Sequence, residues 1–334
     1  PPPPSPPPPP PNKKTTSPVP VLQPERPPPP AADEALAMHL VQRQGWVDQL
    51  QGQDRRALEE LLEFFDRQTR VVDVARAADF RRVVGAGAFA TVLLGTARAS
   101  GRPFALKKLT RGNGTPMEKM LRDFRSECEM MARLRHPNII TLLGTTKEPI
   151  GLVMEYCSRG SLFQLLADTD IPLNWPTKKK MAAEVASGMQ YLHSQQIIHR
   201  DLKSLNILIT DNWNIKVTDF GLSRFKATTA SDKMTGQAGT YHWMAPEVIN
   251  SEFYTEKADV YSFGIILWEI YTRGVPFDGM QPVQVVAAVV NRGERPRIPL
   301  HCPETLAQLI RLCWHLVPTH RPGFDAVVGR LGVM

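Results

Sequence analysis

A short polar tract, HRDLKSLN, lies between two aliphatic segments whose composition is typical of buried strands. It runs from His199 to Asn206 and carries five ionisable or amide side chains. Burying a charge without a partner costs several kcal/mol, so such a tract either faces water as an ordinary turn or holds ions.

A second polar tract, KVTDFG, follows and ends at Gly221, with Asp219 lying 13 residues after Asn206. The aliphatic segments 207–209 and 215–217 predict a hairpin that brings Asn206 near Asp219. Amide carbonyl and carboxylate oxygens are ligands that magnesium takes when nucleotide phosphates also hold it. The two tracts therefore predict a metal site.

A glycine-rich stretch, GAGAFA, runs from Gly85 to Ala90 between two segments that look like strands, 80–84 and 91–94. This predicts a strand-loop-strand flap and not the strand-loop-helix of a dinucleotide fold. Glycines let backbone N–H groups approach phosphate oxygens. Such strings also occur in purely structural hairpin turns.

Lys107 ends an apolar strand-like segment, FALK, and a lysine facing inward is rare unless it is paired. A segment with helical apolar spacing follows and offers Glu127 as the partner. Glu129 is the competing candidate, although it lies about 200° around the helix from Glu127.

Composition limits the class of protein. With 334 residues and 42% apolar content, the chain can bury a full core. No run approaches the roughly 20 apolar residues of a membrane span, and no signal peptide is visible. The cysteines show no CxxC spacing, which fits a reducing compartment. We expect a cytoplasmic protein, with the nucleus left open.

The net charge of +7 is not concentrated in one basic block, so we expect no nucleic-acid partner. A basic surface suited to anionic ligands is enough to explain the charge.

The amino-terminal part divides into two segments. Residues 1–30 hold 17 of the 31 prolines, which predicts a disordered, polyproline-like segment. It is either a ligand for a proline-reading domain or a solvated spacer. Residues 31–77 show apolar steps of three and four and predict an amphipathic helical extension that packs on the following domain or on an upstream region. Because residue 1 is proline, we expect further sequence upstream.

Residues 78–333 resemble a eukaryotic protein kinase domain. The glycine-rich loop, FALK, the helix glutamate, HRDLKSLN, DFG, the APE at Ala245 and HRPGF occur in family order. HRDLKSLNIL, GTYHWMAPEV, DVYSFGIILWEI and LCWHLVPTHRP resemble the tyrosine-kinase-like group of serine/threonine kinases, which includes Raf-like and mixed-lineage kinases. The resemblance implies a bilobal α+β fold, with a small antiparallel β lobe and one key helix at 78–154 and a larger, mainly helical lobe at 158–333.

The resemblance also implies a catalytic set. Lys107, fixed by Glu127, would hold the ATP phosphates. Asp201 would accept the proton of the substrate hydroxyl, while Lys203 offsets charge on the transferred phosphate. Asn206 and Asp219 would bind Mg²⁺, with Mn²⁺ as a substitute.

The nucleotide site implied by the resemblance comprises the loop, the strand residues around it and the hinge: Gly85, Ala86, Gly87, Ala88, Phe89, Ala90, Val92, Ala105, Lys107, Met154, Glu155, Cys157 and Leu208. Ala90 departs from the family pattern because it occupies the third glycine position. We expect altered flap dynamics there and retained ATP binding.

Packing roles and regulation are implied as well. His199 and Phe220 are expected in the core, and Glu247 with Arg321 as a structural ion pair. Arg200 would receive an activation-segment phosphate. The candidate phosphosites are Thr228, Thr229, Ser231 and Thr235, and the alternative is that these are solvated loop residues.

The function predicted from these motifs is transfer of the γ-phosphate of ATP to Ser/Thr hydroxyls of protein substrates in signal transduction. Lys203 and Gly239-Thr240 resemble serine/threonine kinases. The alternatives are a dual-specificity kinase, and a nucleotide-binding scaffold without catalysis.

Overall fold

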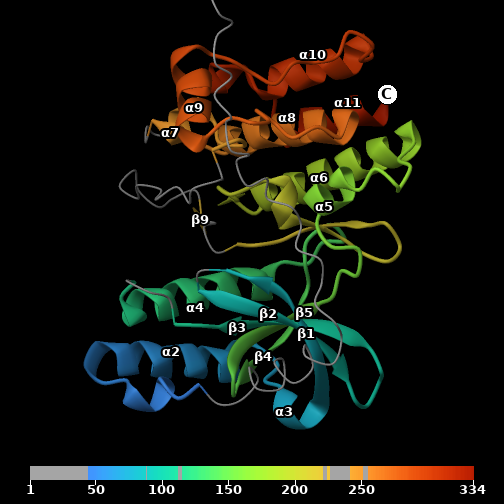
Figure 1. The fold of residues 1–334 in the computed structure, drawn as a ribbon. Helices are drawn as coiled ribbons and strands as arrows, with labels where there is room; N and C mark the ends of the chain where they lie inside the picture. Colours follow the sequence, from blue (N-terminus) through green and yellow to red (C-terminus); the bar gives the residue numbers. More distant parts are fainter. Residues whose placement is uncertain (1–43, 88, 112–114, 221–223, 226–240, 251–254) are drawn as a thin grey trace, which may run out of the picture.

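Two lobes make up the protein, one built around a β-sheet and one built of helices (Figure 1). The computed structural model describes residues 44–87, 89–111, 115–220, 224–225, 241–250 and 255–334. The proline-rich segment 1–30 predicted from composition lies outside these residues. None of the helices in the described ranges is both long and apolar enough to cross a membrane.

The small lobe is organised around a five-stranded antiparallel sheet with the strand order β1-β2-β3-β5-β4. Each strand is joined to its neighbour in the sequence by a short hairpin, except between β3 and β4, where helix α4 intervenes. The strands are β1 (Ala78–Ala86), β2 (Ala90–Ala97), β3 (Pro103–Leu109), β4 (Leu142–Lys147) and β5 (Ile150–Glu155).

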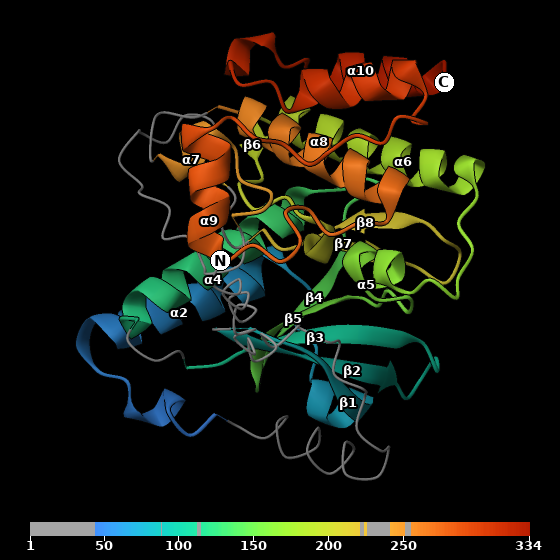
Figure 2. The same ribbon diagram turned by 45° about the horizontal axis from the view of Figure 1, so that its top comes forward.

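Helix α4 (Met117–Arg133) is amphipathic and belongs to the small lobe. Most of its buried apolar residues recur at steps of three and four, as on one face of a helix: Met117, Met120, Leu121, Phe124, Cys128 and Met131, with Met130 beside them. A second long helix, α2 (Gly52–Gln68), lies beside α4 in both views (Figures 1 and 2). The short elements η1 (Val47–Gln49) and α3 (Val74–Ala77) flank α2 in the sequence.

The large lobe is centred on α8 (Lys257–Thr272), whose residues from Ala258 to Ile270 are all buried. A helix that is buried on every side must be surrounded by other elements. Helices α6 and α10 pack against α8. The other helical elements are α5 (Leu162–Ala167), α6 (Trp175–Ser194), α7 (Pro246–Ile249), α9 (Pro282–Val286), η3 (Ala287–Asn291), α10 (Glu304–Cys313), η4 (Pro318–His320) and α11 (Phe324–Gly332).

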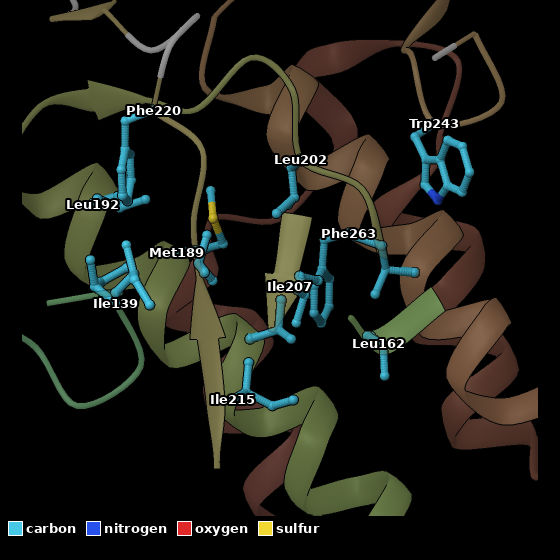
Figure 3. Close-up of a cluster of buried hydrophobic side chains, with 14 of the residues drawn as sticks. Ile139, Leu162, Met189, Leu192, Leu202, Ile207, Ile215, Phe220, Trp243 and Phe263 are labelled. Carbon is cyan, nitrogen blue, oxygen red and sulfur yellow. The ribbon is translucent and has the colours of Figure 1, made fainter. Parts of the chain in front are cut away.

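Two short antiparallel strand pairs complete the β structure of the described residues. Strand β6 (Ile197–Ile198) pairs with β9 (Arg224–Phe225), and β7 (Ile207–Ile209) pairs with β8 (Ile215–Val217). Ile207 and Ile215 lie in one apolar cluster with Met189 and Leu192 of α6 and Phe263 of α8 (Figure 3). This core fixes the hairpin that the sequence predicted. The predicted bilobal α+β fold is confirmed.

Glu247 and Arg321 form the expected ion pair inside the large lobe. The guanidinium Nη1 and Nη2 donate to the two carboxylate oxygens at 2.6 and 2.9 Å. Arg321 also donates to the backbone oxygens of His315, Leu316 and Lys257. The pair therefore has the bidentate geometry and additional hydrogen bonds that a buried charge requires.

We predict that Arg321→Ala destabilises the large lobe by about 3–5 kcal/mol, because it leaves the buried Glu247 carboxylate without a partner. The free energy of unfolding measured with urea tests this. The matched control is Arg311→Ala, which breaks an exposed pair with Glu304 and should cost less than about 1 kcal/mol. Equal losses in both variants would contradict the assignment.

Candidate active site

The β7–β8 hairpin brings the two polar tracts of the sequence together. Ile207 pairs with Val217, and the Thr218 N–H donates to the Asn206 carbonyl oxygen at 3.0 Å. Asp219 follows directly. The backbone thus places the end of one tract beside the start of the other, as the spacing predicted.

Asp201 is the centre of a buried polar group in the first tract. Its Oδ2 accepts from Lys203 Nζ at 2.7 Å and from Asn206 Nδ2 at 2.9 Å. Asn206 Nδ2 also donates to the Asp201 backbone oxygen at 2.9 Å. Because both bonds use the amide nitrogen of Asn206, its Oδ1 is the atom that suits a metal ion.

Lys107 joins three elements through its ammonium group. Its Nζ lies 2.6 Å from Glu127 Oε1 on α4 and 3.5 Å from Asp219 Oδ1. Burial opposes the charge on Lys107, but the carboxylates of Glu127 and Asp219 outweigh it and raise the lysine pKa. The positive charge of Lys107 in turn lowers the pKa of Asp219, with a smaller contribution from Lys203. Asp219 is therefore an ionised oxygen donor.

Glu129, the competing partner considered from the sequence, points elsewhere. It pairs with Arg125 on the same helix at 3.0 Å. The helical offset between the two glutamates thus separates their contacts.

The glycine-rich loop joins β1 and β2, and the Gly87 N–H donates to the Ala90 carbonyl at 2.8 Å. A Cβ added at Gly85 or Gly87 would meet other atoms only at 3.6 Å or beyond. The protein's own packing therefore does not require glycine at either position, and the space above the backbone suits a close phosphate. Phe89 is partly exposed, and Ala88 lies outside the described residues.

Four of the nucleotide-site candidates share one face of the sheet. Val92 is the cross-strand neighbour of Lys107, and Ala105 is the neighbour of Met154. Since Ala105 and Lys107 are two residues apart on β3, all four side chains lie on the same side.

The hinge candidates follow β5. Glu155 Oε1 accepts from the Thr141 N–H and from Lys216 Nζ, both at 2.8 Å. Cys157 is buried next to it, and Leu208 on β7 is partly buried. The Glu155 side chain is thus occupied by the protein, which leaves backbone groups as the hinge's contacts for a ligand.

Two buried acidic side chains on α8 accept hydrogen bonds from the polar tract, and the sequence reasoning did not identify either. Asp259 accepts from the backbone N–H groups of His199 and Arg200 at 2.8 and 2.9 Å, and its Oδ2 lies 2.9 Å from His193 Nε2. Burial raises the pKa of Asp259, but these partners outweigh burial and lower it overall.

Glu269 is the second of these acidic side chains. It accepts from Ser204 Oγ at 2.8 Å and from Trp243 Nε1 at 2.7 Å. Ser204 belongs to the tract of Asp201, and Trp243 lies just before the APE sequence, so Glu269 connects the two segments. Burial raises its pKa to about 8. A charged residue within the apolar run DVYSFGIILWEI was the available signal for both positions.

His199 and Phe220 lie in the interior, as expected. The Asp201 N–H donates to His199 Nδ1 at 3.3 Å, so Nε2 carries the proton that the Thr218 oxygen accepts at 3.0 Å. The rings of His199 and Phe220 are 5.6 Å apart.

Arg200 and Asp219 have left-handed backbones, with φ of 70° and 68°. Such conformations cost energy for residues other than glycine and concentrate at functional sites.

The candidate phosphosites Thr228, Thr229, Ser231 and Thr235, and Thr240, lie outside the described residues.

Comparison with known families assigns the chain. The family model described as protein tyrosine and serine/threonine kinase matches residues 78–331. The chain therefore belongs to this family, which confirms the predicted resemblance and implies ATP and a divalent metal.

Several curated relatives are similar to the chain. A probable serine/threonine-protein kinase of Dictyostelium discoideum, drkD, is 43% identical over 249 residues, which cover 73% of this chain and 19% of drkD. A second from that organism, drkA, is 44% identical over 252 residues, covering 74% and 38%. The serine/threonine/tyrosine-protein kinase HT1 of Arabidopsis thaliana is 44% identical over 216 residues, covering 64% and 55%. The matched region thus covers between 19% and 55% of the length of these three relatives.

Glu269 predicts a specific pH dependence of stability. Its pKa is 4.5 in a free chain and about 8 in the folded protein, so folding holds its proton more tightly. The stabilisation linked to this proton is complete below about pH 4.5 and is lost as the pH rises through about 8. Glu269→Gln removes this titration and keeps the size of the side chain. We expect the free energy of unfolding of the wild type, relative to this variant, to fall as the pH rises from about 6 to about 9. Urea unfolding across that range measures it, and a constant difference would contradict the prediction.

Proposed function

We propose that this protein is a serine/threonine protein kinase that transfers the γ-phosphate of ATP to hydroxyls of protein substrates. The observation that carries the proposal is one array of charged side chains that spans both lobes. Glu127, Lys107 and Asp219 are linked by ion pairs. Asp201, Lys203 and Asn206 form the adjoining group.

The small lobe binds the nucleotide in this proposal. Lys107, held by Glu127 at 2.6 Å, contacts the α- and β-phosphates, and the loop from Gly85 to Ala90 covers them. The adenine ring lies among the apolar side chains that share the sheet face and contacts hinge backbone groups. Its contacts are Val92, Ala105, Met154, Glu155, Cys157 and Leu208.

The metal ligands are Asn206 Oδ1 and the Asp219 carboxylate. Both are hard oxygen donors, and Asp219 is kept ionised by Lys107. This donor set fits Mg²⁺, with Mn²⁺ as a substitute. When bound, the cation supplies positive charge beside the phosphate oxygens.

Asp201 acts on the hydroxyl of the protein substrate. It accepts the hydroxyl proton and orients the oxygen in line with the phosphate, while Lys203 offsets negative charge on the group in transfer. The hydrogen bond from Asn206 and the ion pair with Lys203 hold the carboxylate in one orientation. Most of the rate therefore comes from positioning and electrostatic stabilisation.

Dual specificity is the second candidate function. One observation favours it. HT1, which is 44% identical to this chain, is named a serine/threonine/tyrosine-protein kinase. Identifying the phosphorylated side chains distinguishes the two candidates.

The remaining parts of the proposal concern regulation and partners. Phosphorylation of Thr228, Thr229, Ser231 or Thr235 activates the enzyme, with Arg200 as the receiver of the phosphate. Residues 1–30 bind a proline-reading domain, residues 31–77 form a helical extension of the kinase domain at 78–333, and the protein acts in the cytoplasm.

We predict that Asp201→Asn lowers kcat by about 10²–10⁴-fold, because the amide cannot accept the hydroxyl proton. Incubation with ATP and Mg²⁺, followed by mass spectrometry of the phosphorylated residues, measures this. The matched control is Asp211→Asn, the same change on an exposed residue of the β7–β8 turn, which should stay within roughly twofold of the wild type.

The same experiment tests the scaffold alternative. ATP binding without phosphate transfer by the wild type, including protein treated with an activating kinase, would favour a nucleotide-binding scaffold. Phosphate on tyrosine as well as on serine or threonine would establish dual specificity.

A further inference from the structure

Helix α2 lies outside the region that matches the kinase family, yet the segment containing it is fixed to the sheet at both ends. Before α2, the Gln44 side chain donates to the Leu109 carbonyl and accepts from the Ile150 N–H. After α2, Thr69 Oγ1 lies 2.7 Å from Thr145 Oγ1 on β4. The backbone then pairs with Thr145 on both sides, through the Arg70 carbonyl and the Val72 N–H.

Between these anchors, α2 presses an apolar face against α4. Leu58, Leu61 and Phe65 are buried and belong to the same cluster as Leu121 and Phe124 of α4. The two helices lie side by side in both views (Figures 1 and 2). One face of α4 is thus covered by a second helix, which also contacts β4 of the sheet.

Polar contacts set the position of α4 along this face. Its own N-cap residue, Pro116, provides no side-chain cap. Asp54 of α2 supplies the missing acceptor, because its Oδ1 accepts from the Glu118 N–H at 2.8 Å in the first turn of α4. Two turns further on, Arg125 pairs with Glu60 of α2 at 2.9 Å.

These contacts act on the residue that pairs with Lys107. Glu127 lies on α4 between the helix ends. A shift of α4 that separates Glu127 from Lys107 must therefore disturb its contacts with α2, whose segment is anchored to the sheet. We propose that residues 44–72 are an intramolecular brace that positions α4, and that Asp54 is a positioning residue for the Lys107–Glu127 pair. This inference rests on the proposed function, since the pair serves the nucleotide.

The test uses the full chain and three variants. Asp54→Ala removes the acceptor at the first turn of α4, and Asp54→Asn retains an oxygen acceptor there. Glu63→Ala is the matched control, because Glu63 is an exposed acid on the same helix, and its ion pair within the described residues is with Arg67 of that helix. For each protein we would measure amide hydrogen exchange in 117–133, affinity for ATP with Mg²⁺, kcat and KM for ATP, and thermal unfolding.

Loss of a helix cap costs about 1 kcal/mol, which corresponds to about fivefold. We expect Asp54→Ala to speed amide exchange in α4 by about that factor and to lower both the affinity for ATP and kcat/KM for ATP. Asp54→Asn should restore the exchange rate, the affinity and kcat/KM, and Glu63→Ala should leave all three at the wild-type values.

Other outcomes would overturn the proposal. Equal effects of Asp54→Ala and Glu63→Ala would do so, as would faster exchange throughout β4 and β5 to the same extent as in α4, which would mean a general loss of stability. Faster exchange in α4 with unchanged ATP affinity and kcat/KM would remove the positioning role. A wild type that transfers no phosphate refutes the proposed function instead, while exchange and ATP affinity still decide on the brace.

Discussion

The ion pair between Lys107 and Glu127 is the constraint on which the small lobe depends. The two side chains are only 16% and 6% exposed, so either charge alone would be buried without compensation. The sheet that carries Lys107 and the helix that carries Glu127 must therefore meet in one arrangement. Asp219 approaches the same ammonium group from the large lobe at 3.5 Å, so the pair also provides one of the contacts between the two lobes.

The catalytic tract is held by a different device, because little of it is regular structure. Asp259 and Glu269, which are spaced along the buried helix α8, accept hydrogen bonds from the backbone and side chains of the tract. A buried helix that carries two acidic side chains can hold an irregular segment in one conformation. Its Asp259 also bonds the N–H of Arg200, whose left-handed backbone costs on the order of 1–3 kcal/mol. Stability elsewhere in the large lobe therefore offsets strain next to the reacting groups.

Much of the fold and the site could be predicted from the sequence because their signals are local. Strand and helix periodicity, the FALK lysine and the 13-residue spacing from Asn206 to Asp219 all lie within short windows. The contacts that were missed join distant positions: Asp54 with Glu118, and Glu269 with Ser204. A single carboxylate carries no local pattern that reveals such a partner. DVYSFGIILWEI resembles a family motif, but the role of its two acidic residues depends on the burial of α8 and on their contacts with the polar tract.

The packing of α2 on α4 has a consequence for what counts as a domain here. The family match begins at residue 78, after the end of α2. A protein cut at that boundary would expose to water the face of α4 that packs against α2. Contiguous apolar surface of this kind promotes self-association and aggregation. Helix α2 thus belongs to the same packed body as the small lobe, although it precedes the region that is similar to other kinases.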